Sequence, residues 1–147
     1  MFLKKYLHFG PHFIFKIKFI IIKYSILIAT CQILVDRYHG EVPREFDQLV
    51  ELPGVGRKTA NVVVSVLFGT PAIAVDTHVF RVSNRLKLGI AKTPEEMEQK
   101  LQKAIPKKDW AAAHHWLIYH GRRLCKARKP LCNECFLNHL CPSAGKV

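Results

Sequence analysis

Acidic residues are scarce in this chain. Its 147 residues include 11 Asp and Glu against 23 Lys and Arg, which gives a formal net charge of +12 at neutral pH. A surplus of this size suits a polyanionic partner, such as nucleic acid or an acidic membrane surface. Because charge reports on association and not on activity, a basic protein without such a partner stays open at this point.

The chain also lacks an uninterrupted apolar run that could span a bilayer. A spanning helix needs about 20 largely uncharged residues, but the apolar stretch 13–29 is interrupted by Lys16, Lys18 and Lys23. Its uninterrupted part, residues 24–29, is shorter than the core of a signal peptide. We therefore expect an intracellular protein, without secretion or a membrane anchor, in which this stretch packs on the domain or is not a native start.

An evenly paired set of cysteines is missing as well. Four of the five cysteines fall between Cys125 and Cys141, and Cys31 stands alone, which disfavours a disulfide framework. The four follow the pattern Cys125-x6-Cys132-x2-Cys135-x5-Cys141, which is typical of a four-cysteine site for zinc or an iron–sulfur cluster. Zinc ribbons usually contain two Cys-x-x-Cys pairs, and here only Cys132 and Cys135 form one. The spacing therefore favours a [4Fe–4S] cluster, with Zn²⁺ as the alternative.

Strand patterns and internal repeats are absent, and the periodicity from Cys31 onward is helical. Helix signals predict an all-α fold with one moderate core, because 147 residues are too few for two full-sized domains. The segment 57–68 is apolar nearly all round, so we expect it to be a buried central helix. The first expected helix ends near His39, and the next two cover 46–52 and 57–68. A fourth follows Asp76, a fifth begins at Pro94 and ends before Pro106, and the last covers 109–124.

The run Leu52-Pro53-Gly54-Val55-Gly56-Arg57-Lys58 carries the first functional signal. A Gly-x-Gly turn that opens a helix leaves backbone N–H groups available to bind an anion such as phosphate. Lys58 lies in the first turn, where the helix dipole and the expected burial disfavour its ammonium form and favour a nucleophile. Asp76 is expected to cap the next helix and to place a carboxylate nearby. The alternatives are an ordinary helix–helix turn, a solvated lysine and a purely structural cap.

Basic side chains also cluster between the first two of the grouped cysteines. Lys126, Arg128 and Lys129 precede Pro130, and this finger is expected to contact DNA phosphate. Four further arginines belong either to a solvated face or to the DNA footprint: Arg81, Arg85, Arg122 and Arg123. Six other side chains are assigned to the core or its rim: His78, His114, His115, His120, Trp110 and Trp116.

Taken together, the hairpin, the Lys58 and Asp76 pair and the four cysteines resemble the endonuclease III family of bifunctional iron–sulfur DNA glycosylases. The resemblance covers roughly residues 29–144 and implies the helix-hairpin-helix glycosylase fold with a C-terminal cluster loop. It implies that Lys58 attacks C1′ of a flipped nucleotide, that Asp76 assists, and that β-elimination cuts the strand 3′ to the abasic site. The substrate would be an oxidised pyrimidine or an abasic site in double-stranded DNA. The resemblance implies no small-molecule substrate, and we expect the protein to be a monomer.

The N-terminal region departs from the family pattern. The resemblance implies further helices before the matched region, with a glutamine loop that fills the gap left by the flipped base, but residues 1–28 contain no glutamine. We expect a truncated or divergent member in three parts: the segment 1–28, a helical domain at 29–109, and a last helix with the cluster loop at 110–147. Glycosylase activity would be reduced or absent, with weak DNA binding and lyase chemistry retained; the alternative is an inactive remnant or DNA-binding module.

Overall fold

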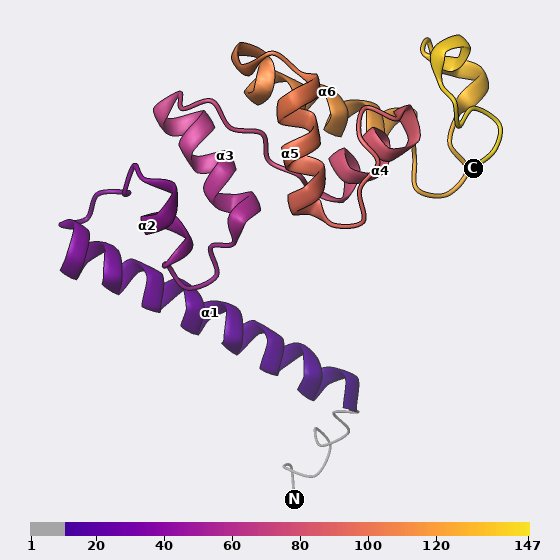
Figure 1. Cartoon of the computed structure of the whole chain (residues 1–147). Helices are drawn as coiled ribbons and strands as arrows, with labels where there is room; N and C mark the ends of the chain where they lie inside the picture. The colour runs from indigo at the N-terminus through magenta and orange to yellow at the C-terminus, as the bar shows by residue number, and fades with distance from the viewer. Residues whose placement is uncertain (1–10) are drawn as a thin grey trace, which may run out of the picture. The chain divides into compact units, whose positions relative to one another are not determined.

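The computed structural model describes residues 11–147, and side chains from residue 20 onward (Figure 1). The chain divides into two compact units, one ending at Val55 and the other running from Gly56 to Val147. All regular structure in the described residues is helical, which confirms the predicted all-α fold class. No described helix is both long and apolar enough to cross a membrane. The division at residues 28 and 109 stays a prediction, and residues 1–10 of its first part lie outside the described range.

The first unit consists of a long helix and a short one. Helix α1 (Pro11–Tyr38) ends where the sequence predicts, because His39 and Gly40 adopt positive φ angles of 55° and 84°. The Gly40 N–H then donates to the Leu34 carbonyl at 2.8 Å, which closes the last turn. Helix α2 (Phe46–Val50) follows and buries Leu49.

Four helices and three short 3₁₀ turns make up the second unit. The helices are α3 (Arg57–Phe68), α4 (Thr77–Leu86), α5 (Pro94–Ala104) and α6 (Trp110–Arg123), and the turns are η1 (Lys107–Asp109), η2 (Cys132–Glu134) and η3 (Asn138–Leu140). Local signals set several of their starts. The Thr93 hydroxyl accepts from the Glu96 N–H at 3.2 Å, and Pro94 occupies the first helical position.

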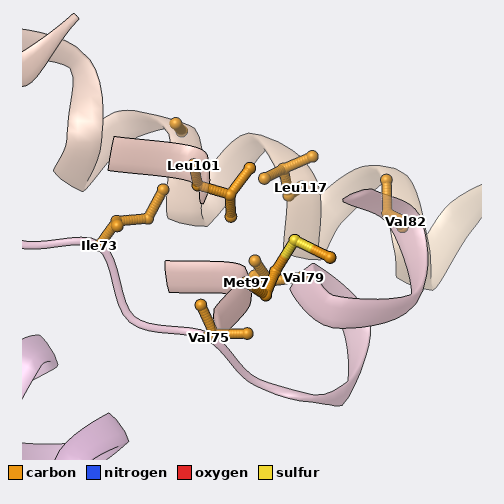
Figure 2. Packing of buried hydrophobic residues seen from close by; sticks show 8 residues of the cluster. Ile73, Val75, Val79, Val82, Met97, Leu101 and Leu117 are labelled. Atoms are coloured by element: carbon orange, nitrogen blue, oxygen red, sulfur yellow. The ribbon is translucent and has the colours of Figure 1, made fainter. Parts of the chain in front are cut away.

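The core of the second unit lies where α4 packs against α5 and α6. Figure 2 shows its apolar side chains converging between these helices and the segment that precedes α4. Each helix presents residues three or four positions apart, as an amphipathic helix requires. The buried members are Ile73, Val75, Val79, Val82, Met97, Leu101, Ala113 and Leu117.

Helix α3 has the predicted bounds but not the predicted burial. Only Ala60, Asn61 and Val64 are buried, whereas Val66 and Leu67 are 60% and 61% exposed. The expectation of a helix buried all round is therefore wrong in this structure. The three buried residues lie on one face, at positions i, i+1 and i+4. Within its own unit this helix packs against α6, which leaves the opposite apolar face uncovered by the described residues of that unit.

Candidate active site and cysteine loop

A short buried segment leads from α3 to Asp76. Residues 72–75 are all less than a tenth exposed, although they form no helix. Their carbonyl groups therefore need partners. The Asn61 amide of α3 donates to the Ile73 carbonyl at 3.5 Å, and His114 Nδ1 of α6 lies 2.7 Å from the Ala74 carbonyl. Because a carbonyl oxygen only accepts, Nδ1 carries the proton in this contact. Two helices thus fix the backbone that delivers Asp76.

Asp76 is the N-cap of α4, as predicted. Its Oδ1 accepts hydrogen bonds from the backbone N–H groups of His78 and Val79, both at 2.8 Å. The carboxylate is half-buried, and no donor among the described residues reaches its Oδ2. One oxygen therefore holds the helix start while the other remains available to a substrate. The structural and the chemical roles of this carboxylate are compatible.

Lys58 is the second residue of α3, and its side chain is exposed, so the expected burial is wrong. It lines a cavity of about 550 Å³, part of it open to solvent, together with Gly56, Arg57, Val75, Pro94, Glu95 and Glu98. Val75 directly precedes Asp76, so the carboxylate follows directly after a residue that lines the same cavity as Lys58. Burial is the main cause that lowers the pKa of His114, and the charges of Asp76 and Lys58 also act on this ring, in opposite directions. The amine and the carboxylate therefore both act electrostatically on the same buried ring.

The two hairpin glycines differ in what the fold requires. Gly54 has a φ of 74°, and a Cβ there would approach Cγ2 of Ile26 to 2.5 Å. Its conformation and its surroundings both require glycine. Gly56 has a φ of −90°, and no atom of the described residues lies within 4 Å of a Cβ built on it. It provides no side-chain cap for α3, so the start of this helix is open to an external group.

The remaining hairpin residues occupy different environments. Leu52 is only 5% exposed, and Val55 is half-buried. The Arg57 side chain makes two hydrogen bonds of 2.8 Å with Glu98 of α5. No sequence signal marks this pair, because its members are 41 positions apart. Contact of residues 52–57 with DNA stays a prediction.

The four grouped cysteines line one cavity of about 370 Å³, part of it open to solvent, next to Arg85 and His120. All four are half-buried and free of disulfides. Thiolates surrounding one space are the donors that iron–sulfur clusters use, so the residues fit such a group. A single metal ion is a different case, because no three His, Cys, Asp or Glu side chains in the described part of the chain are grouped closely enough to hold one. Lys126, Arg128 and Lys129 are exposed on the same loop.

Two arginines of α4 hold this loop, and sequence reasoning had left their role open. The Arg81 guanidinium donates to the carbonyls of Gly121 and Cys125, both at 3.0 Å. The Arg85 guanidinium donates to the Lys126 carbonyl at 2.7 Å and the Ala127 carbonyl at 3.2 Å, and lies 3.4 Å from Cys125 Sγ. These contacts satisfy carbonyls at and beyond the C-terminal end of α6. Arg122 and Arg123 are exposed.

The aromatic residues of α6 divide between buried and exposed positions. His114 is only 7% exposed and belongs to the core, as predicted. The ring of His120 is half-buried, with Nε2 3.8 Å from Cys135 Sγ. Trp116 is 61% exposed and His115 is also exposed, so their assignment to the core or its rim is wrong.

Family comparisons agree with this arrangement. The family model of HhH-GPD superfamily base excision DNA repair proteins matches residues 12–107, and that of the iron–sulfur binding domain of endonuclease III matches residues 125–141. The second match confirms the predicted iron–sulfur cofactor, a [4Fe–4S] cluster.

Individual relatives show the same similarity. Endonuclease III of Rickettsia conorii is 55% identical over 115 residues, which are 78% of this chain and 55% of the relative. Endonuclease III of Escherichia coli K12 is 51% identical over 121 residues, 82% of this chain and 57% of the relative. A solved structure of a trapped endonuclease III–DNA covalent intermediate matches with a TM-score of 0.82 and 51% identity, over 92% of this chain and 64% of that one. The chain thus spans just over half of the length of these curated relatives. It belongs to the HhH-GPD superfamily of base excision DNA repair proteins, and the relatives that it resembles within this superfamily are endonucleases III.

Proposed function

We propose that this chain acts in base excision repair as a DNA glycosylase and abasic-site lyase, with Lys58 as the nucleophile. The observation that carries the proposal is the cavity that both Lys58 and Val75, the residue directly before Asp76, line. An amine beside a carboxylate suits Schiff-base chemistry on a sugar. The similar endonuclease III has been trapped in a covalent intermediate with DNA, which supports covalent chemistry in this chain.

The reaction begins with a nucleotide flipped out of the duplex. The unprotonated Lys58 amine forms a bond to C1′ of the deoxyribose, and the bond from C1′ to the base breaks with its electron pair leaving on the base. One amine proton passes to the departing base. The bond from C1′ to O4′ then breaks, O4′ takes up a proton from water, and a protonated Schiff base remains between Lys58 and C1′. Loss of a proton from C2′ expels the 3′ phosphate, which cuts the strand. Oδ2 of Asp76 stabilises the positive charge that develops on the sugar.

DNA would bind at two places of different chemistry. The start of α3 has no side-chain cap, and Gly56 leaves room for close approach, which suits a phosphate oxygen. The exposed Lys126, Arg128 and Lys129 supply positive charge on the cysteine loop. Both contacts are independent of base sequence. Recognition of oxidised pyrimidines is our proposal for the lesion class, and it rests on the family resemblance.

The cysteine loop would serve this reaction indirectly. Cys125, Cys132, Cys135 and Cys141 line one cavity and would hold the cluster. When bound, the cluster supplies a structural cross-link between residues far apart in the loop. The loop's own contribution is to hold its three basic side chains in place against the DNA backbone.

Borohydride trapping tests the proposal directly. The unaltered chain is mixed with an abasic-site duplex and sodium borohydride, which reduces a Schiff base to a stable adduct. We expect a covalent adduct that is lost in Lys58→Ala and kept in Lys103→Ala, which removes an exposed lysine of α5. An adduct that survives Lys58→Ala would assign the reaction to another amine. The absence of any adduct with the unaltered chain would favour a DNA-binding module without chemistry.

A second duplex separates the two activities. With an oxidised thymine in place of the abasic site, the same trap reports excision of the base before the lyase step. An adduct with both duplexes supports the bifunctional enzyme. An adduct with the abasic duplex alone restricts the function of this chain to the lyase reaction.

A further inference from the structure

Glu98 is a buried carboxylate that needs hydrogen-bonded partners. It is 4% exposed and is the only acidic residue among the buried side chains of the described chain. Burial of an ionised carboxylate is unfavourable unless it is paired and hydrogen-bonded. The Arg57 Nε and Nη2 atoms each donate to one of its oxygens at 2.8 Å, and the Gln102 amide lies 3.3 Å from Oε1. Both carboxylate oxygens therefore have charged partners.

The ion pair lies at the start of the helix that carries the proposed nucleophile. Arg57 is the first residue of α3 and Lys58 the second, so the two side chains leave adjacent backbone positions. Arg57, Lys58 and Glu98 line the same cavity. A forked, two-bond contact fixes the direction of a guanidinium as well as its distance. The pair therefore ties the first turn of α3 to α5.

This contact also changes what Arg57 offers to a ligand. The Glu98 carboxylate neutralises the guanidinium locally, and its hydrogen bonds raise the pKa of Arg57. Nε and Nη2 form the edge that would otherwise bind a phosphate through two parallel bonds. Because Glu98 occupies that edge, the same edge cannot bind the DNA backbone while the pair is intact.

We propose that Glu98 is a positioning residue for Lys58, and that it acts by holding Arg57 and the first turn of α3 against α5. Arg57 then serves the reaction through the ion pair and not through a phosphate contact. The inference rests on the proposed role of Lys58 as nucleophile. It predicts a defect in the rate of the bound complex, because misplacement of a reacting group by about 1 Å can cost about 10²-fold.

The test separates binding from reaction. Affinity is measured by fluorescence anisotropy on a duplex with a non-reactive tetrahydrofuran abasic analogue, over a series of salt concentrations. The trapping rate is measured in single turnovers at saturating protein on an abasic-site duplex. We expect Glu98→Gln and Arg57→Met each to lower the saturated rate about 10- to 100-fold. Their affinities should change less than about threefold, with the salt dependence unaltered, because no phosphate contact is lost.

Lys129→Met is the matched control, because it removes an exposed cation from the proposed DNA-binding finger. It should weaken binding and reduce the salt slope by about 1, which is the signature of a lost phosphate contact. If Arg57→Met behaves like Lys129→Met, Arg57 is a phosphate contact and the proposal is wrong. Equal saturated rates in Glu98→Gln and the unaltered chain would overturn this proposal alone. The absence of adduct with the unaltered chain would overturn both this proposal and the proposed function.

A double variant distinguishes positioning from mere stabilisation. Glu98 is the buried member of the pair, whereas the Arg57 side chain is 49% exposed. Replacement of a buried charge together with its partner by apolar residues of similar size is often neutral or stabilising. Arg57→Met combined with Glu98→Leu should therefore melt within a few degrees of the unaltered chain, yet its saturated rate should stay as low as in the single variants. Recovery of the rate together with the melting temperature would show that the pair acts only on stability, and would refute a positioning role.

Discussion

The Lys58–Asp76 site and the cysteine loop are held in place in different ways. The segment that delivers Asp76 is buried throughout, and it adjoins the apolar core formed by α4, α5 and α6. By contrast, no residue from 122 to 147 is buried. The loop is held by hydrogen bonds from Arg81 and Arg85, by its 3₁₀ turns, and by the Ser143 hydroxyl, which donates to the Arg85 carbonyl at 2.9 Å.

The site and the loop are therefore stabilised by different kinds of interaction. Apolar burial stabilises the site through the core, without help from a cofactor. Polar contacts that water can reach contribute little each, because protein–water hydrogen bonds replace them on opening. We therefore expect the loop to depend on the iron–sulfur cluster for its order, whereas the site depends on helix packing. The predictions below test this contrast.

Loss of the cluster should have the largest effect and should be confined to the loop. Cys132→Ser removes one of the four proposed ligands, and we expect loss of the visible absorbance of the cluster and rapid proteolysis within 125–141. The far-UV circular dichroism should change little, because α3 to α6 pack without the loop. Cys31→Ser is the control, since Cys31 is exposed and lies outside the group. Unfolding of the helices together with the loop would contradict the contrast.

A cavity in the apolar core should destabilise the helices that carry the site, unlike loss of the iron–sulfur cluster. Leu101 is fully buried in the apolar core shown in Figure 2, and Leu101→Ala should reduce the free energy of unfolding by about 2–5 kcal/mol. Leu140→Ala removes the same atoms from a side chain that is 69% exposed on the loop, so it should cost less than about 0.5 kcal/mol. Urea unfolding followed by circular dichroism measures both, and similar losses would show that the loop is also packed.

Sequence reasoning was most successful where the signal is local. The cap at Asp76, the cap at Thr93 and the bounds of α3 all depend on a few neighbouring residues, and the structure confirms them. Such signals depend on which backbone groups at a helix end lack partners. The cysteine spacing also predicted the cofactor, because ligands within one loop leave their mark on the sequence.

Features that depend on distant contacts were missed or wrong. The pair of Arg57 and Glu98 spans 41 positions, and the contact of Arg85 with Cys125 spans 40. Neither residue type nor periodicity indicates which charges will meet across such a separation. The exposure of Lys58 and of the outer face of α3 likewise depends on which elements cover them. An apolar composition cannot specify this, because roughly half of a protein surface is apolar.

Loosening of the loop without removal of a ligand should give an intermediate effect. Arg85→Ala removes hydrogen bonds to the carbonyls of Lys126 and Ala127 and the contact with Cys125 Sγ. We expect a chelator to bleach the cluster several-fold faster than in the unaltered chain, with the helical content preserved. Arg85→Lys should fall between the two, because an ammonium cannot make the forked contacts. Arg123→Ala removes an exposed arginine of α6 and should leave the bleaching rate unchanged.

Mild acid should produce the smallest effect, and it should act on the buried contact of His114 near the Lys58–Asp76 site. Burial lowers the pKa of His114 below its ordinary value of 6.5, an effect that His115 and Lys58 reinforce and that the Ala74 contact and Asp76 oppose. The unfolded chain then binds this proton more readily than the folded chain. Stability is therefore complete above about pH 6.5 and falls as the pH drops from there through the folded pKa.

His114→Gln isolates this contribution, because a glutamine amide can still donate to the Ala74 carbonyl but does not titrate. The variant should lose less stability than the unaltered chain between pH 7.5 and pH 5.5, as measured by urea unfolding at the two values. His139→Gln, which removes an exposed histidine of the loop, should keep the full pH dependence. An equal loss in His114→Gln and the unaltered chain would show that acid acts elsewhere, and the site would then lack the pH-sensitive buried contact that distinguishes it from the exposed loop.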